Sequence, residues 1–216
     1  MKPNPSEHVL NLSLLLIKGM TLDQIDDSVW IERVKEGDQT AFSLLFRRHV
    51  GWVYNKAFRV LKNHEDTEEV CQDIFMKVWT KINLWDPKQG SFQTWLNEIA
   101  KNTIIDALRK RRRDKEKPMR WVDEEKRVTL LDLMPDPRPS PDREVESREA
   151  YELIEEALLE VRRDEHRIAW VLRHIEGLGI SEIAKVMDRK ENTIKVWIFR
   201  CSAELRRLLK AKGVEL

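Results

Sequence analysis

The sequence has little cysteine and little glycine, with two and seven residues respectively in a chain of 216. Cys71 and Cys201 lie far apart, form no CxxC pair and have no histidine at metal-ligand spacing, so we expect two reduced, buried side chains. The glycines form no phosphate-binding loop or nucleophile elbow, and the five histidines form no HExxH motif. We therefore expect no metal site, no cofactor and no enzymatic activity.

Long apolar runs are also missing. The run at residues 12–17 is much shorter than a membrane span, has little positive charge before it and is followed by no small-residue cleavage site. These features argue against a secretory signal and against membrane insertion. We expect a cytoplasmic protein.

A strong net charge is the third absence, because charged residues make up 36% of the chain while the formal net charge is only +1. The basic residues are concentrated locally instead. Residues 109–117 contain seven Lys or Arg against two acids, and residues 195–212 contain six against one. Locally basic helices beside acidic ones fit a protein that contacts DNA phosphates on some surfaces and a protein partner on others.

Helical periodicity runs through the chain and strand signals are nearly absent, so the sequence predicts an all-α fold. A helix from about residue 65 buries one apolar face, consisting of Cys71, Ile74, Phe75, Val78 and Ile82. Its opposite face presents Glu69, Gln72, Asp73 and Met76. A second helix starts after an N-cap at Ser91 and buries Phe92, Trp95, Leu96, Ile99 and Thr103. A further face of that helix carries Glu98, Asn102, Ile105 and Arg109.

Proline divides the chain into two small helical domains joined by a flexible linker. Residues 114–142 hold five of the eight prolines and cannot continue a helix, because proline lacks the amide donor. We predict a first domain at residues 28–113, with earlier helices at about 29–36 and 39–61, and a second at residues 143–212. Fully extended, the linker spans about 95 Å at roughly 3.3 Å per residue, so the domains can reach separated sites.

The second domain ends in a helix-turn-helix pattern. Ile183, Ala184 and Met187 mark a short helix, residues 188–190 a turn, and an apolar stripe from Ile194 a longer helix. In this motif the second helix enters the major groove of DNA. Its outward residues are predicted to be Asn192, Lys195, Val196, Phe199 and Arg200.

Several ordered stretches together resemble the sigma-70 family of bacterial transcription factors, in its small extracytoplasmic-function (ECF) branch. They are WIERVKEGDQTAFSLLFRRH (30–49), EDTEEVCQDIFMKVW (65–79), GSFQTWLNEIAKNTIIDALRKRRR (90–113) and the helix-turn-helix text from residue 180. The resemblance implies sigma domains 2 and 4, preceded by an N-terminal extension at residues 1–27. It also implies an alternative sigma factor that binds the beta-prime and beta subunits of core RNA polymerase and directs initiation at promoter DNA. An anti-sigma factor is a further candidate partner.

The resemblance assigns roles to the faces described above. Glu69, Gln72 and Asp73 match the family's core-binding motif, with each acid exchanged for the other, and Met76 lies on the same face. Asn102 and Trp85 match positions that hold a base flipped out of the minus-10 element, beside Ile105, Arg109 and Arg112. Packing beneath a loop is the alternative for Trp85, and a solvated helix face is the alternative for the acidic residues.

The helix-turn-helix departs from the family pattern at two positions. Lys195, Phe199 and Arg200 match the family's basic, variable and arginine positions for minus-35 binding, and Asn192 lies at the start of the same helix. Val196 and Trp197 stand where family members commonly have Ser and Arg. Valine packs on a thymine methyl but accepts no hydrogen bond. Trp197 lies at the edge of the buried stripe, so we expect it to pack in the core.

Two other functions fit the same pattern. The first is a helix-turn-helix regulator that binds DNA alone and only shares the sigma scaffold. The second is a protein-binding module whose first domain sequesters another regulator. Promoter-specific transcripts with purified core polymerase separate the sigma factor from both.

Overall fold

The computed structural model describes residues 25–115 and 145–214, with side chains for 25–111 and 152–214. Every regular element in these residues is a helix, as the all-α prediction requires. The order is α2 (Asp27–Lys35), α3 (Gln39–Leu61), α4 (His64–Lys81), the short 3-10 turns η2 (Ile82–Leu84) and η3 (Pro87–Gln89), α5 (Phe92–Lys115), α6 (Val145–Glu160), α7 (Asp164–His174), α8 (Ile180–Met187) and α9 (Glu191–Ala211). Of the predicted N-terminal extension (1–27) and linker (114–142), only residues 25–27 and 114–115 are among those described. The helix α2 already begins at Asp27, and α5 continues to Lys115, so the first two residues of the predicted linker are helical.

The helices of the first domain begin at short polar side chains that accept hydrogen bonds from the first backbone amides. The Asp38 carboxylate accepts from Thr40 N at 2.8 Å and Ala41 N at 3.1 Å, which starts α3. Ser91 Oγ accepts from Thr94 N at 3.2 Å, so the predicted cap of α5 is confirmed. Such caps satisfy amides that have no partner inside the helix.

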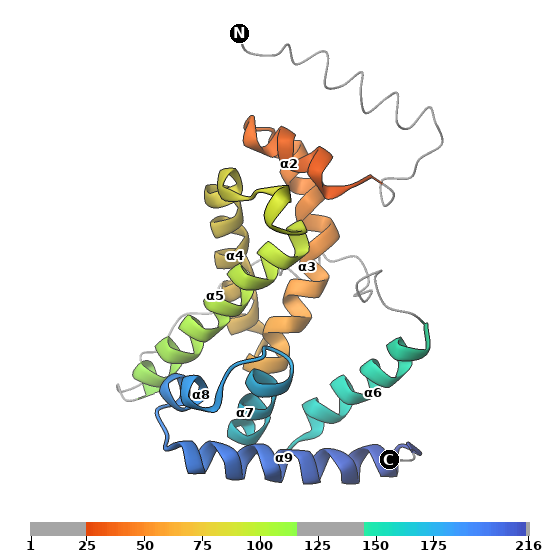
Figure 1. The fold of residues 1–216 in the computed structure, drawn as a ribbon, viewed down its shortest axis with the longest axis vertical. Helices are drawn as coiled ribbons and strands as arrows, with labels where there is room; N and C mark the ends of the chain where they lie inside the picture. The colour runs from red at the N-terminus through yellow and green to blue at the C-terminus, as the bar shows by residue number, and fades with distance from the viewer. Residues whose placement is uncertain (1–24, 116–144, 215–216) are drawn as a thin grey trace.

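The long helices α3, α4 and α5 form the body of the first domain, and α2 crosses one end of it (Figure 1). The predicted apolar face of α4 is buried between its neighbours: Cys71, Ile74, Phe75, Val78 and Ile82. On α5, Phe92, Leu96 and Thr103 are buried and Trp95 and Ile99 are half-buried. The spacing of apolar residues therefore identified the inward faces of both helices.

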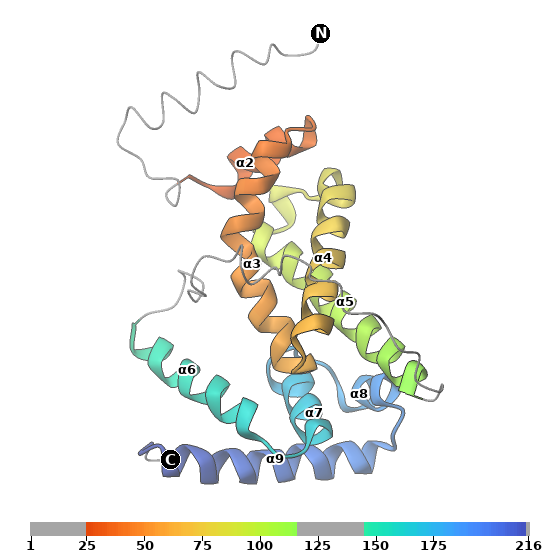
Figure 2. The ribbon, with the colours of Figure 1, turned by 180° about the vertical axis from the view of Figure 1, so that it is seen from behind.

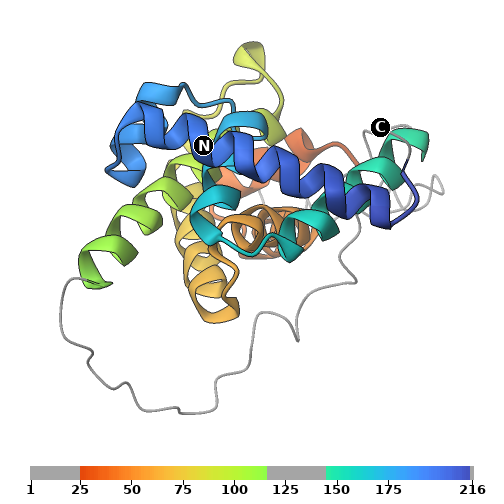
Figure 3. The ribbon, with the colours of Figure 1, turned by 90° about the horizontal axis from the view of Figure 1, so that it is seen from below.

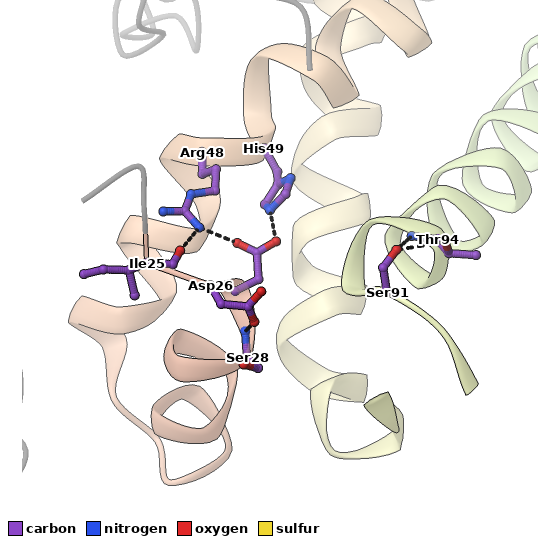
Figure 4. Close-up of polar contacts among 8 residues, drawn as sticks. Ile25, Asp26, Ser28, Arg48, His49, Ser91 and Thr94 are labelled. Atoms are coloured by element: carbon purple, nitrogen blue, oxygen red, sulfur yellow. Dashed lines mark hydrogen bonds and ion pairs between the residues drawn. The ribbon is translucent and has the colours of Figure 1, made fainter. Parts of the chain in front are cut away.

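A carboxylate at the start of α2 fixes that helix onto α3. Asp27 accepts hydrogen bonds from Arg48 Nη1 and His49 Nε2, each at 2.8 Å. In Figure 4 the labelled side chains of Arg48 and His49 both point toward the start of α2, where Asp26 and Ser28 lie. Burial alone would raise the pKa of Asp27, but the His49 and Arg48 contacts outweigh it and hold the pKa below its usual value. The lowered pKa means that the Asp27 carboxylate is ionised in the folded protein.

The second domain consists of α6 to α9, with α9 lying across the other three helices (Figure 2). The predicted turn between α8 and α9 is present, and Asp188 adopts a left-handed backbone conformation there with φ of +46°. Ile194, Cys201, Leu205 and Leu208 are buried along the inner side of α9. The structure thus confirms the helix-turn-helix pattern.

The two domains pack directly against each other rather than lying apart. The C-terminal half of α3 contacts α6 and α7, and α5 contacts α8. In Figure 3, seen from below, α9 lies across the second domain with α3 behind it. The sequence predicted two domains separated by a long linker, but it carried no signal for this contact.

Candidate partner and nucleic-acid interfaces

The acidic and amide side chains of α4 form an exposed face, made of Glu69, Gln72, Asp73 and Met76. Met76 is 62% exposed, which is unusual for so large an apolar side chain. Glu69 accepts a hydrogen bond from Lys110 Nζ of α5 at 2.8 Å, with both side chains largely in solvent. Exposed ion pairs contribute little free energy, so this one leaves Glu69 available to a partner.

Trp85, at the connection between α4 and α5, is packed rather than open to solvent. Only 6% of it is exposed, its ring lies edge-on to Phe92 at 6.3 Å, and Lys35 Nζ lies 5.4 Å from the ring centroid. Its indole N–H is buried and has no hydrogen-bond partner among the described residues. The structure supports packing for Trp85, and a role beside a flipped base stays a prediction that requires the connection to move.

The outer face of α5 is only partly open. Asn102 and Arg109 are exposed, and Arg109 Nη1 lies 3.4 Å from the Asp106 carboxylate. Ile105, placed on the same face from the sequence, is only 8% exposed because it packs against residues of α7, α8 and α9, such as Leu172, Ile183 and Ile194. In this arrangement DNA cannot reach Ile105. Arg112 lies in α5, but its side chain is outside the described set.

The outward face of α9 is open. Asn192, Lys195 and Arg200 are exposed polar residues, and Val196 and Phe199 are exposed apolar ones, with Phe199 73% exposed. These five residues share the surface predicted from their spacing. A basic surface with apolar tips suits the major groove, where side chains meet both phosphates and thymine methyl groups.

The Trp197 side chain, unlike its neighbour Val196 on α9, faces the protein interior. It is half-buried, packs against the cluster that contains Ile183 and Ile194, and lies 6.0 Å from the His166 ring, centroid to centroid. Burial and the nearby Arg163 and Arg200 charges lower the pKa of His166. The neutral ring is therefore the favoured neighbour of Trp197, which fits core packing.

A cavity of about 380 Å³ lies beside α9 and extends its basic surface. Lys195 and Phe199 line it together with Arg206 of the same helix and Arg173 of α7. Neither arginine is among the residues that the sequence predicts to face DNA. Arg206 could have been found, because it lies about three helical turns beyond Lys195. Arg173 could not, because no periodicity relates residues on separate helices.

Cys71 and Cys201 are free and buried, as predicted, and burial raises the pKa of each thiol to about 12. In the described ranges no three His, Cys, Asp or Glu residues are grouped as metal ligands would be. Neither range contains a helix with both the length and the apolar character of a bilayer span.

Comparison with known proteins identifies both domains. The Sigma-70 region 2 family matches residues 45–114, and the Sigma-70 region 4 family matches residues 151–205. The chain is 32% identical over 208 residues to the ECF RNA polymerase sigma factor SigE of Mycolicibacterium smegmatis, covering 90% of this chain and 76% of the relative. It is 29% identical over 184 residues to SigW of Bacillus subtilis, covering 83% of this chain and 95% of that one.

A solved structure of the sigma factor RpoE from Bartonella quintana, in complex with the anti-sigma factor NepR, aligns with a TM-score of 0.41. It shares 20% identity with this chain and covers 78% of it and 96% of the RpoE chain. The two family matches fall on the two helical domains, and the relatives align across both. This chain therefore belongs to the ECF branch of the sigma-70 family of RNA polymerase sigma factors.

Proposed function

We propose that this alternative sigma factor directs promoter-specific initiation through separate surfaces on α4, α5 and α9. The α4 face binds core RNA polymerase, α5 holds the melted minus-10 element, and α9 reads the minus-35 element. The observation that carries the proposal is that the polar α4 residues and the outward α9 residues are exposed on different domains. The chain performs no chemistry itself, and it acts in the cytoplasm, where polymerase and DNA are found.

The α4 face suits a basic partner surface. Glu69 and Asp73 supply negative charge, Gln72 supplies an amide that both donates and accepts, and Met76 adds an adaptable apolar contact. Charge complementarity of this kind fixes the register of two surfaces more than it adds affinity. We assign this face to the docking of core polymerase.

The α5 and α9 surfaces suit DNA in different ways. On α5, the exposed Asn102 amide can hydrogen-bond the Watson–Crick edge of an unpaired base. Arg109 is exposed about two turns further along the same helix, where it can contact phosphates. On α9, Lys195 and Arg200 provide positive charge, and Val196 provides a methyl surface. We assign base capture to α5 and duplex recognition to α9.

Replacing Arg109 or Arg112 with Ala should weaken binding of the holoenzyme to promoter DNA almost equally for all sequences. If each arginine contacts one phosphate, the slope of log affinity against log salt falls by about one unit per residue. Fluorescence anisotropy across a salt series measures the slope. Arg47→Ala, at an exposed position of α3, is the matched control and should leave the slope unchanged. An altered base preference with an unaltered slope would show direct base contact instead.

Val196→Ser should leave the fold intact and change the promoter preference at one minus-35 position, away from a thymine whose methyl group the valine covers. Trp197→Arg should instead destabilise the protein by about 2 kcal/mol or more, because it removes a large packed side chain. Thermal melts and a selection from randomised minus-35 elements measure both effects. A stable Trp197→Arg protein with a new promoter choice would show that the two roles are reversed.

A regulator that binds DNA without polymerase is the second candidate, and the exposed recognition face of α9 favours it. The two functions differ in whether polymerase is needed for specific binding. We expect the purified chain alone to bind duplex promoter DNA weakly and with little sequence preference, and the holoenzyme to bind it specifically. Equal specificity with and without core polymerase would favour the independent regulator.

A further inference from the structure

The cavity beside α9 lies where this helix meets the end of α7 and the start of α8, both of which pack on it (Figure 1). Its charged lining residues are basic, and among the described residues no aspartate or glutamate lines it. The apolar residues that line it are Ile180, Ile198, Phe199 and Ala203. Its volume of about 380 Å³ is in the range of small-molecule sites, which combine an apolar lining with a few polar groups. A small anion with an apolar part suits this cavity.

Two of the lining side chains are held in place by hydrogen bonds. Arg173 donates from Nη1 to Leu178 O at 3.0 Å, which fixes its guanidinium and leaves the remaining N–H groups for a ligand. Ser202 Oγ accepts from Trp170 Nε1 at 3.1 Å and donates to Ile198 O at 3.0 Å, so it ties α7 to α9 at the cavity wall. Side chains that are already ordered lower the entropic cost of binding a ligand.

The two other cations of the cavity, Lys195 and Arg206, are exposed on α9 and have no carboxylate partner among the described residues. Their backbones are about 16 Å apart along the helix, at roughly 1.5 Å per residue. An arginine can bind a phosphate through two parallel hydrogen bonds, and a lysine binds it as a point charge. Cations spread over this length suit a chain of phosphates better than a single small ion.

Phe199 supplies an aromatic surface in the same cavity. It is 73% exposed, so its ring is open to stacking by a nucleobase. His174 also lines the cavity, and burial and the nearby Arg173 charge lower its pKa. Its ring is therefore neutral at neutral pH and offers one donor and one acceptor to the polar edge of a base or to a ribose. An aromatic base and a chain of phosphates occur together in nucleotides.

We propose that this cavity binds a free nucleoside polyphosphate, with the phosphates on the three basic residues and the base on Phe199. Lys195 and Phe199 also belong to the predicted minus-35 face, so a bound nucleotide covers part of the surface that the duplex needs. The nucleotide therefore competes with minus-35 DNA. This competition rests on the proposed function of α9, but the nucleotide site itself does not.

Calorimetric titration of the full-length chain with ATP tests the site. ATP should bind one to one, and tripolyphosphate and adenosine should each bind more weakly, because each lacks one part of the ligand. Arg206→Ala should weaken ATP binding by roughly tenfold or more, because a charge-assisted contact is lost. Arg207→Ala makes the same change at the next position of α9, which is exposed but does not line the cavity, and should bind ATP as the wild type does.

Phe199→Ala separates the two parts of the site, since it should weaken binding of ATP and leave binding of tripolyphosphate unchanged. Absence of saturable ATP binding would overturn the proposal. Equal losses with Arg206→Ala and Arg207→Ala would also overturn it, because they would indicate adsorption to a basic surface. If ATP does not bind, and Arg206→Ala lowers the salt slope of DNA binding by about one unit, the cavity contacts a DNA phosphate instead.

Displacement of a fluorescein-labelled minus-35 duplex from the chain tests the competition, at low and constant ionic strength. Polymerase is left out because its active site binds nucleotides itself. ATP at ten times its own Kd should weaken duplex binding by roughly tenfold, and should have little effect on the Arg206→Ala chain. ATP binding that depends on Arg206 but leaves duplex binding unchanged would overturn the competition and count against α9 as the face that reads DNA, while the nucleotide site would stand.

Discussion

The double substitution Gln72→Ala with Asp73→Lys is expected to abolish binding to core RNA polymerase while the chain keeps its fold. Both side chains are exposed on α4 and point away from the buried stripe that contains Ile74 and Phe75. The new lysine places a positive charge against a partner surface expected to be basic, and like charges at an interface cost several kcal/mol, roughly two orders of magnitude or more in affinity. Co-purification with core enzyme measures the effect, and circular dichroism measures helical content.

A matched control separates loss of docking from a general effect of charge. Gln39→Ala with Glu36→Lys also removes one glutamine amide and replaces one acid with lysine, at exposed positions where α2 meets α3. That variant should bind core polymerase as the wild type does. If the Gln72 and Asp73 variant recovers core enzyme normally and has normal helical content, the α4 face is not the docking surface.

The second large effect is expected at Asn102. Asn102→Ala should leave the closed promoter complex intact but slow strand opening by roughly tenfold or more, because an unpaired base loses its hydrogen-bond partner and the cost of unstacking is no longer offset. Permanganate footprinting of unpaired thymines over time measures opening, and anisotropy measures the closed complex. The residue is exposed on α5, so no loss of stability should accompany the effect.

Asn97→Ala is the control for this result, because it removes the same amide from the same helix at a half-buried position away from the Asn102 face. It should open the promoter at the wild-type rate. A wild-type footprint for Asn102→Ala would count against the capture of a base on α5. Weaker closed-complex binding by the variant would indicate that Asn102 contacts duplex DNA instead.

Local signals in the sequence accounted for the helices and their inward faces. The bounds of α3, the cap at Ser91 and the buried stripe from Cys71 to Ile82 all follow from rules that act within one or two turns of helix. The half-buried position of Trp197 and the exposed position of Val196 follow from the same periodicity.

The contact between the domains could not be predicted in this way. Periodicity shows that Ile105 lies away from the main apolar stripe of α5, but it does not show that α8 covers it. Lys56 and Glu176 lie 120 positions apart, and each looks like an ordinary charged surface residue until the fold brings them together. Trp85 is a related case. Its position in the sequence is compatible with both packing beneath the loop and contact with DNA, and in the structure its side chain is packed and buried.

The central claim is that this chain gives the polymerase its promoter specificity through α4, α5 and α9. Run-off transcription with purified core polymerase tests this claim most directly. The templates would be promoters found by sequencing transcripts after overexpression of the chain. The account predicts a discrete transcript from these templates only when the chain is added, and its loss with the Gln72 and Asp73 double variant. A transcript pattern unchanged by the chain, or specific DNA binding that never yields a transcript, would contradict it.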